Sequence, residues 1–179
     1  MSTQTEIPSL SSLEYLPYID ETGCIDENVR GKIGVYAIFN QNREMQYVGY
    51  SRDVYLSLKQ HLIRQPEKCY WVKIETITRP SRKILEDIAS AWIAENGSTP
   101  EGNDRNLAIW TEPIDANPAM TEEEKAQYQQ SEELKQTKIR KKVARRVEAQ
   151  ILERLGDRGV KMDIRFNPKL KEKGLLDLK

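Results

Sequence analysis

The chain has very few side chains suited to metal or redox chemistry. Its 179 residues include two cysteines, Cys24 and Cys69, and one histidine, His61. The cysteines lie far apart, and the sequence has neither a Cys-x-x-Cys pair nor a Cys/His cluster of the kind that holds zinc. This scarcity argues against a structural metal site.

Long apolar runs and an excess of one charge are also missing. No segment approaches the roughly 20 apolar residues that span a bilayer, and the polar start MSTQTEIPS has no signal-peptide pattern. We therefore expect a cytoplasmic protein with reduced thiols and no membrane contact. Lysine and arginine number 28, as do aspartate and glutamate, so any attraction to a polyanion must come from a local patch.

The first half of the chain contains a regular succession of strand and helix signals. Residues 32–39 and 45–50 are rich in β-branched and aromatic residues and flank a turn, which predicts a hairpin. Ser51 or Asp53 can cap a helix that ends near Pro66, residues 69–77 predict a third strand, and a second helix fits between Pro80 and Gly97. Trp71 and Trp92 fall within apolar periods and are expected in the core.

The second half is predicted to be helical. Thr121 and Glu124 form a capping box, and an apolar stripe continues from Leu134 to Leu155, which predicts one long amphipathic helix. The fold class is therefore α/β of the α+β type, with a small three-stranded antiparallel sheet flanked by helices and a long C-terminal helix. The expected divisions are a lead-in (1–31), a compact domain (32–103), a linker (104–120) and a helical extension with a docking tail (121–179).

Two tripeptides stand in the predicted hairpin: Gly34-Val35-Tyr36 in the first strand and Tyr47-Val48-Gly49 in the second. This arrangement, followed by a helix and by Asn103, resembles the GIY-YIG nuclease family. The resemblance covers residues 32–103 and implies metal-assisted phosphodiester hydrolysis with Mg²⁺ or Mn²⁺. Without the tripeptides, the two tyrosines would read as ordinary half-buried strand residues.

The resemblance also implies roles for individual residues. Tyr36 would activate or orient water with Tyr47 beside it, while Gly34, Gly49 and Asn103 would be structural. His61 matches a position where the family often has histidine or tyrosine; an exposed helix residue is the alternative interpretation. Glu86 is the nearest candidate for the metal ligand.

The family's helix arginine is missing, because the corresponding position is Ser57. A phosphate-clamping arginine can contribute about 10³ to 10⁵ in rate. We therefore expect a protein with weak or lost hydrolysis that acts as a binding module for nucleic acid or a protein complex. The alternative is an active divalent-metal-dependent endonuclease.

A basic block follows the acidic start of the long helix. Residues 135–146 contain no acid, and the candidates for contacts with DNA or RNA are Lys138, Arg140, Lys141, Lys142, Arg145 and Arg146. A solvated surface is the alternative interpretation. The tail from Ile164 to Leu178 is apolar enough to dock on the body of the protein or on a protein partner, and the sequence does not choose between them.

Overall fold

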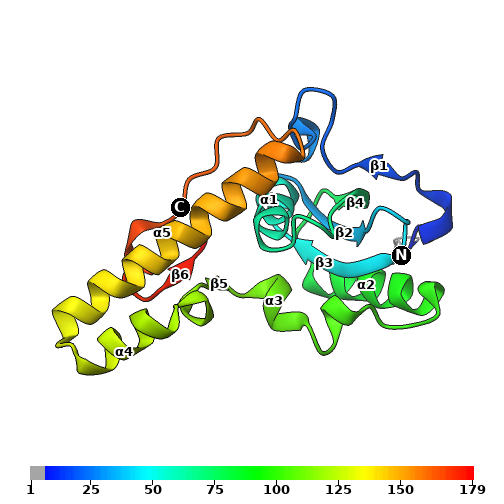
Figure 1. Cartoon of the computed structure of the whole chain (residues 1–179). Helices are drawn as coiled ribbons and strands as arrows, with labels where there is room; N and C mark the ends of the chain where they lie inside the picture. The colour runs from blue at the N-terminus through cyan, green and yellow to red at the C-terminus, as the bar shows by residue number, and fades with distance from the viewer. Residues whose placement is uncertain (1–6) are drawn as a thin grey trace. The chain divides into compact units, whose positions relative to one another are not determined.

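The computed structural model describes residues 7–179, which divide after Thr111 into two compact units (Figure 1). In the first unit, the strands are β1 (Leu16–Pro17), β2 (Ile33–Phe39), β3 (Met45–Ser51) and β4 (Trp71–Ile77). Its α-helices are α1 (Val54–Arg64), α2 (Arg82–Asn96) and α3 (Leu107–Thr111). Short 3-10 helices are η1 (Leu10–Ser12), η2 (Glu27–Val29) and η3 (Glu101–Asn103).

The sheet of the first unit is antiparallel and has the strand order β1-β4-β2-β3. The predicted class of antiparallel sheet with helices is confirmed, but the sheet has four strands rather than three. The additional strand, β1, has only two residues and pairs with Trp71 and Val72. Two residues carry no alternating pattern, and Pro17 lacks an N–H, which suits it to the edge of a sheet.

Strand β2 lies inside the sheet and is buried from Gly34 to Phe39. On one face, Val35, Ala37 and Phe39 pack in a core cluster with Leu85, Ile88 and Trp92 of α2. Tyr36, which alternates with these residues, contacts α1 on the other face. The two helices therefore cover opposite faces of the sheet.

The local signals for these helices are confirmed. The side chain of Asp53 accepts a hydrogen bond from the Leu56 N–H and so caps α1. Ser81 caps α2 through the Ile84 N–H, and Gly97 ends α2 in the left-handed conformation with φ 86°. Short-range hydrogen bonding is thus sufficient to place both helices.

Asn103 completes the outer edge of β3. The Val48 N–H donates to Asn103 Oδ1 at 2.7 Å, and Asn103 Nδ2 donates to the Val48 carbonyl at 2.7 Å. The Asn103 amide thus supplies the hydrogen bonds that a further strand would make to Val48 at this edge of the sheet. The resemblance implied only that Asn103 is structural; the structure places its side chain at the edge of β3.

The second unit contains α4 (Glu122–Gln130), α5 (Glu133–Asp157), α6 (Pro168–Lys171), β5 (Ile114–Asp115), β6 (Leu175–Leu176) and η4 (Asn117–Ala119). Figure 1 shows α4 folding back beside α5. The prediction of one uninterrupted helix from Thr121 is therefore wrong in this respect. The chain becomes extended at Ser131 and Glu132, and the turn lets Arg146 of α5 bond Glu124 of α4 at 2.7 Å.

The C-terminal tail packs on its own unit. Strand β6 pairs with β5, Phe166 bridges Leu178, and the Leu176 side chain is fully buried. Buried residues of α5, including Val143 and Ile151, contribute to the same core. The apolar tail residues are thus occupied within the chain.

Within residues 7–179, every helix falls short of the length or apolar character that crossing a bilayer requires.

We predict that Asn103→Ala destabilises the protein by about 2 kcal/mol, because it leaves a buried strand N–H and C=O without partners. Urea unfolding followed by circular dichroism measures this change. Asn42→Ala is the matched control, since that exposed amide makes only a 3.5 Å contact with Glu44. Equal effects of the two substitutions would contradict the proposed edge closure.

Candidate functional site

Tyr36 and Tyr47 lie on the same face of the hairpin. Tyr36 pairs with Gly49, Tyr47 pairs with Ile38, and the two ring centroids are 6.2 Å apart. A Cβ on Gly49 would lie 2.7 Å from the Tyr36 hydroxyl oxygen and 2.6 Å from the Tyr47 ring. Glycine at position 49 is therefore what allows both phenol rings to occupy this face.

His61 projects from α1 onto the same pair of rings. Its Nε2 lies 2.8 Å from the Tyr36 hydroxyl, and its ring centroid is 4.7 Å from that of Tyr47. Trp110 of α3 stacks on Tyr47, with an interplanar angle of 3° and a centroid distance of 5.2 Å. We call Tyr36, Tyr47, His61 and Trp110 the aromatic cluster.

Burial controls the electrostatics of this cluster. Tyr36 is 2% exposed and His61 is 4% exposed. Burial raises the pKa of Tyr36 well above its ordinary value. Burial also lowers the pKa of His61 to about 3, and the positive charge of the nearby Arg64 contributes to this decrease. Burial also raises the pKa of Tyr47, with Arg64 opposing the shift. At neutral pH the phenols and the imidazole are all uncharged.

The residues expected to complete a hydrolytic site have other roles. Ser57, in the place of the family arginine, donates a hydrogen bond to Ser51 Oγ at 2.6 Å. The Glu86 carboxylate accepts hydrogen bonds from Arg82 at 2.8 Å and from the Tyr50 hydroxyl at 3.1 Å. The pKa of Glu86 is lowered, chiefly by the hydrogen bond from Arg82. Glu86 is therefore held in an exposed ion pair.

A shallow pocket of about 350 Å³ opens beside the cluster. Tyr47, Glu86 and Asn103 line it together with Tyr50, but Tyr36 and His61 do not. The structure thus brings Tyr36, Tyr47 and His61 together. Glu86 lines the neighbouring pocket, and of these three residues only Tyr47 also lines it.

Trp110 is the member of the cluster that sequence reasoning missed. The sequence places Trp110 in the expected linker, residues 104–120. Its segment forms the short helix α3, and the Trp110 carbonyl accepts a hydrogen bond from Arg64 at 2.8 Å. The available signal was a tryptophan in the expected linker, because tryptophan side chains are on average highly buried.

The basic block of α5 divides into tethered and exposed side chains. Arg146 bonds Glu124, Arg140 donates to the Tyr128 hydroxyl, and Lys141 lies 3.6 Å from Glu172. In contrast, four exposed cations have no ion pair within residues 7–179: Lys135, Lys138, Lys142 and Arg145. We call these four side chains the basic face.

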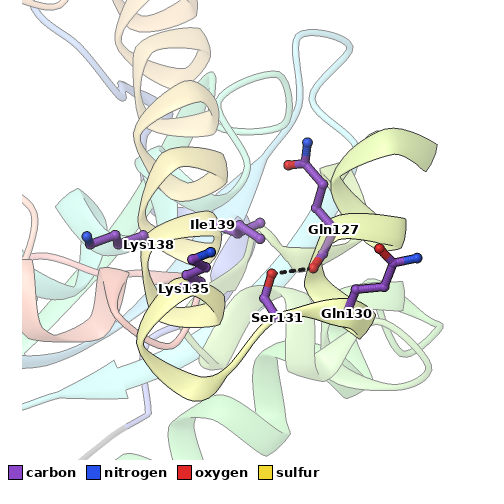
Figure 2. Close-up of a pocket in the computed structure, with 6 residues that line it drawn as sticks. All are labelled: Gln127, Gln130, Ser131, Lys135, Lys138 and Ile139. Atoms are coloured by element: carbon purple, nitrogen blue, oxygen red, sulfur yellow. Dashed lines mark hydrogen bonds between the residues drawn. The ribbon is translucent and has the colours of Figure 1, made fainter.

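A pocket of about 490 Å³ lies next to the basic face, between α4 and α5 (Figure 2). Its lining residues are Gln127, Gln130, Ser131, Lys135, Lys138 and Ile139. Two of them belong to the basic face, and none is acidic. The turn between α4 and α5, which the sequence did not predict, creates this pocket.

Comparison with known proteins gives one relative to consider. Over 101 residues the chain is 32% identical to the chloroplastic bifunctional monothiol glutaredoxin-S16 of Arabidopsis thaliana. The match covers 54% of this chain but only 33% of the relative. No protein-family model matches the chain.

This comparison corrects the GIY-YIG assignment and the nuclease function inferred from it. The relative is named as a monothiol glutaredoxin, not as a nuclease. We therefore withdraw both forms of the nuclease hypothesis, the weakened one and the active one. Because the chain spans about a third of that relative, the relative's own activity is not assigned to this chain either.

The predicted Mg²⁺ or Mn²⁺ cofactor is corrected for the same reason, and the side chains agree. Residues 7–179 contain no group of three or more histidine, cysteine, aspartate or glutamate side chains that could hold a metal ion. Glu86, the expected ligand, is instead paired with Arg82.

The thiols do not form a reactive centre of the kind that the relative's name implies. Cys69 is fully buried, and its Sγ lies 3.7 Å from the His61 carbonyl. Cys24 is partly exposed and directs its Sγ toward the Thr22 carbonyl at 3.8 Å. Reactive cysteines are typically accessible and lie at a helix N-terminus or beside a cation. Neither thiol combines these features, so the residues present do not fit a thiol redox site.

We predict that the His61 imidazole does not titrate between pH 5 and 8 in the folded protein. Its proton resonances can be followed by NMR without ambiguity, because the chain has one histidine. In urea the same resonances should titrate near about 6.5. A midpoint near this value in the folded protein would contradict the buried, neutral state.

The lowered pKa of His61 makes the free energy of unfolding depend on pH. Below pH 6.5 the unfolded chain binds a proton at His61, whereas the folded chain does so only near pH 3. The His61 contribution to stability is therefore complete above pH 6.5 and is lost as the pH falls from about 6.5 toward 3.

Proposed function

We propose that this chain is a nucleic-acid-binding module that contacts phosphate groups through the basic face of α5. The observation that carries the proposal is the position of Lys135, Lys138, Lys142 and Arg145 on one side of the helix. Their spacings of three, four and three residues match the helical repeat, so they extend over about 15 Å of one surface.

The cations of α5 that bond to neighbouring side chains support the proposal, because their contacts fix the orientation of α5. Arg146 is held by Glu124 and Arg140 by Tyr128, while the buried Val143 and Ala144 face the core of the unit. These contacts direct the four members of the basic face outward. No rearrangement is needed for them to meet an extended polyanion.

Side-chain composition favours nucleic acid over an acidic protein. The centres of protein interfaces are typically depleted of lysine and enriched in aromatic residues. The basic face contains three lysines and no aromatic residue between its ends. The apolar residues between Lys135 and Arg145 are half-buried (Ile139) or buried (Val143 and Ala144), and the exposed Leu134 and Leu152 lie outside the face. Phosphate contact without base stacking fits this pattern, and such binding has little sequence preference.

Charge is also unevenly distributed along the chain. The second unit has sixteen lysines and arginines against thirteen acidic residues, whereas the first has twelve against fifteen. The zero net charge of the whole chain therefore conceals a basic unit. A surface of this kind accelerates encounters with polyanions at low salt.

We also retain the cytoplasmic location as a proposal. Cys24 and Cys69 are thiols that do not form a disulfide within residues 7–179, which suits a reducing compartment. The word chloroplastic in the relative's name applies to that protein.

Binding should weaken steeply with salt. For about four phosphate contacts, the slope of log K against log salt for a single strand should be near −3, or about a fifty-fold loss between 50 and 200 mM. Fluorescence anisotropy with a labelled oligonucleotide measures this slope. Lys142→Gln/Arg145→Gln should reduce its magnitude by about 1.4, because two contacts are lost.

The control variant is Lys161→Gln/Lys169→Gln, which removes the same charge from exposed positions off the basic face. It should leave the slope unchanged. Poly-glutamate of matched charge should compete weakly; competition equal to that of the oligonucleotide would overturn the nucleic-acid proposal, as would a flat salt dependence.

The similarity to the monothiol glutaredoxin suggests a thiol redox function, which the positions of the two thiols do not support. From the positions of Cys24 and Cys69, we predict no reduction of a glutathione mixed disulfide above the uncatalysed rate. A coupled glutathione reductase assay measures it. Turnover that is lost in Cys24→Ser but kept in Cys69→Ser would establish a redox centre at Cys24.

A further inference from the structure

We infer that the pocket between α4 and α5 receives an unpaired nucleotide, so that the preferred ligand is single-stranded rather than double-stranded. The inference rests on the proposed nucleic-acid binding and specifies the ligand class. Its starting point is the continuity between the pocket and the basic face, which share Lys135 and Lys138.

The chemistry of the lining suits one nucleotide. Figure 2 shows Gln127 and Gln130 on α4 and Lys135, Lys138 and Ile139 on α5; Ile139 points toward α4, whereas Lys138 extends from the other side of α5. Lysine ammonium groups can hold a phosphate. Glutamine amides offer both a donor and an acceptor, which match the N1 acceptor and the N6–H donor on the pairing edge of an adenine. Ile139 provides an apolar surface for the base.

The polar groups of the lining are available for such contacts. The Ser131 hydroxyl donates to the Gln127 carbonyl at 2.5 Å, which leaves its oxygen able to accept. The Gln127 and Gln130 amides are on exposed residues of α4. Gln136 Nε2 donates to the Tyr128 carbonyl at 2.9 Å and thereby fixes the turn that separates the two helices.

Size and pairing state favour a single strand. A volume of about 490 Å³ lies within the roughly 300–1,000 Å³ usual for small-molecule pockets. A base inside a duplex has its pairing edge engaged and its faces stacked, so it cannot enter the pocket without being extruded, which costs a few kcal/mol. A duplex would therefore use the basic face alone.

The test compares a labelled single strand with a duplex of the same length, using the full chain and fluorescence anisotropy. Gln127→Ala/Gln130→Ala should weaken binding of an adenine-containing single strand about tenfold. Duplex affinity should stay unchanged. The control is Gln129→Ala/Gln150→Ala, which changes exposed glutamines outside the pocket and should affect neither ligand.

The outcomes separate the two claims. If the unsubstituted chain binds with a steep salt slope but the Gln127/Gln130 variant loses nothing, or loses affinity equally for both ligands, only the pocket inference is overturned. If the unsubstituted chain binds neither ligand, both claims fail. Circular dichroism of each variant verifies that the helical content is retained.

Discussion

The structure of the first unit depends on the contact between Tyr36 and Gly49 across the β2–β3 hairpin. Because Gly49 has no Cβ, the Tyr36 and Tyr47 rings can pack side by side against His61 of α1. Trp110 then covers Tyr47, and the result is a buried polar cluster rather than an open cleft. In this low-dielectric setting the neutral forms of tyrosine and histidine are favoured. The cluster is thus better suited to stabilising the sheet–helix interface than to activating water.

The elements that could be predicted are those whose signals are local. Asp53, Ser81 and Gly97 act within one helical turn, and the β2, β3 and β4 segments carry their own strand propensity. Features that need a distant partner were not predictable. Two-residue β1 has no pattern of its own, and the turn at Ser131 is stabilised by helix-to-helix contacts. Burial of the aromatic cluster similarly depends on Trp110, which lies far along the chain.

The same distinction applies to the candidate binding residues. The sequence presents Lys135 to Arg146 as one basic block, but in the structure three of its cations contact other residues of the chain. Arg140, Lys141 and Arg146 are engaged by Tyr128, Glu172 and Glu124, which come from other segments. Sequence spacing can show which cations share a helical face. It cannot show which of them are already paired, because that depends on how α4 and α6 pack on α5.

Under the proposed function, burial and charge together favour the exposed helix over the tyrosine motif as the place where a ligand binds. The motif's titratable groups have been desolvated, and its one exposed carboxylate, Glu86, is neutralised by Arg82. The basic face has the opposite properties. Its four charged groups are exposed to solvent, form no ion pair within residues 7–179, and project outward because buried residues of α5 pack beneath them. A polyanion that binds there displaces only counterions, so the gain in free energy comes without breaking an internal contact. Binding at the aromatic cluster would first require Trp110 to separate from Tyr47, with loss of their packing contact. Binding at the basic face requires no such loss.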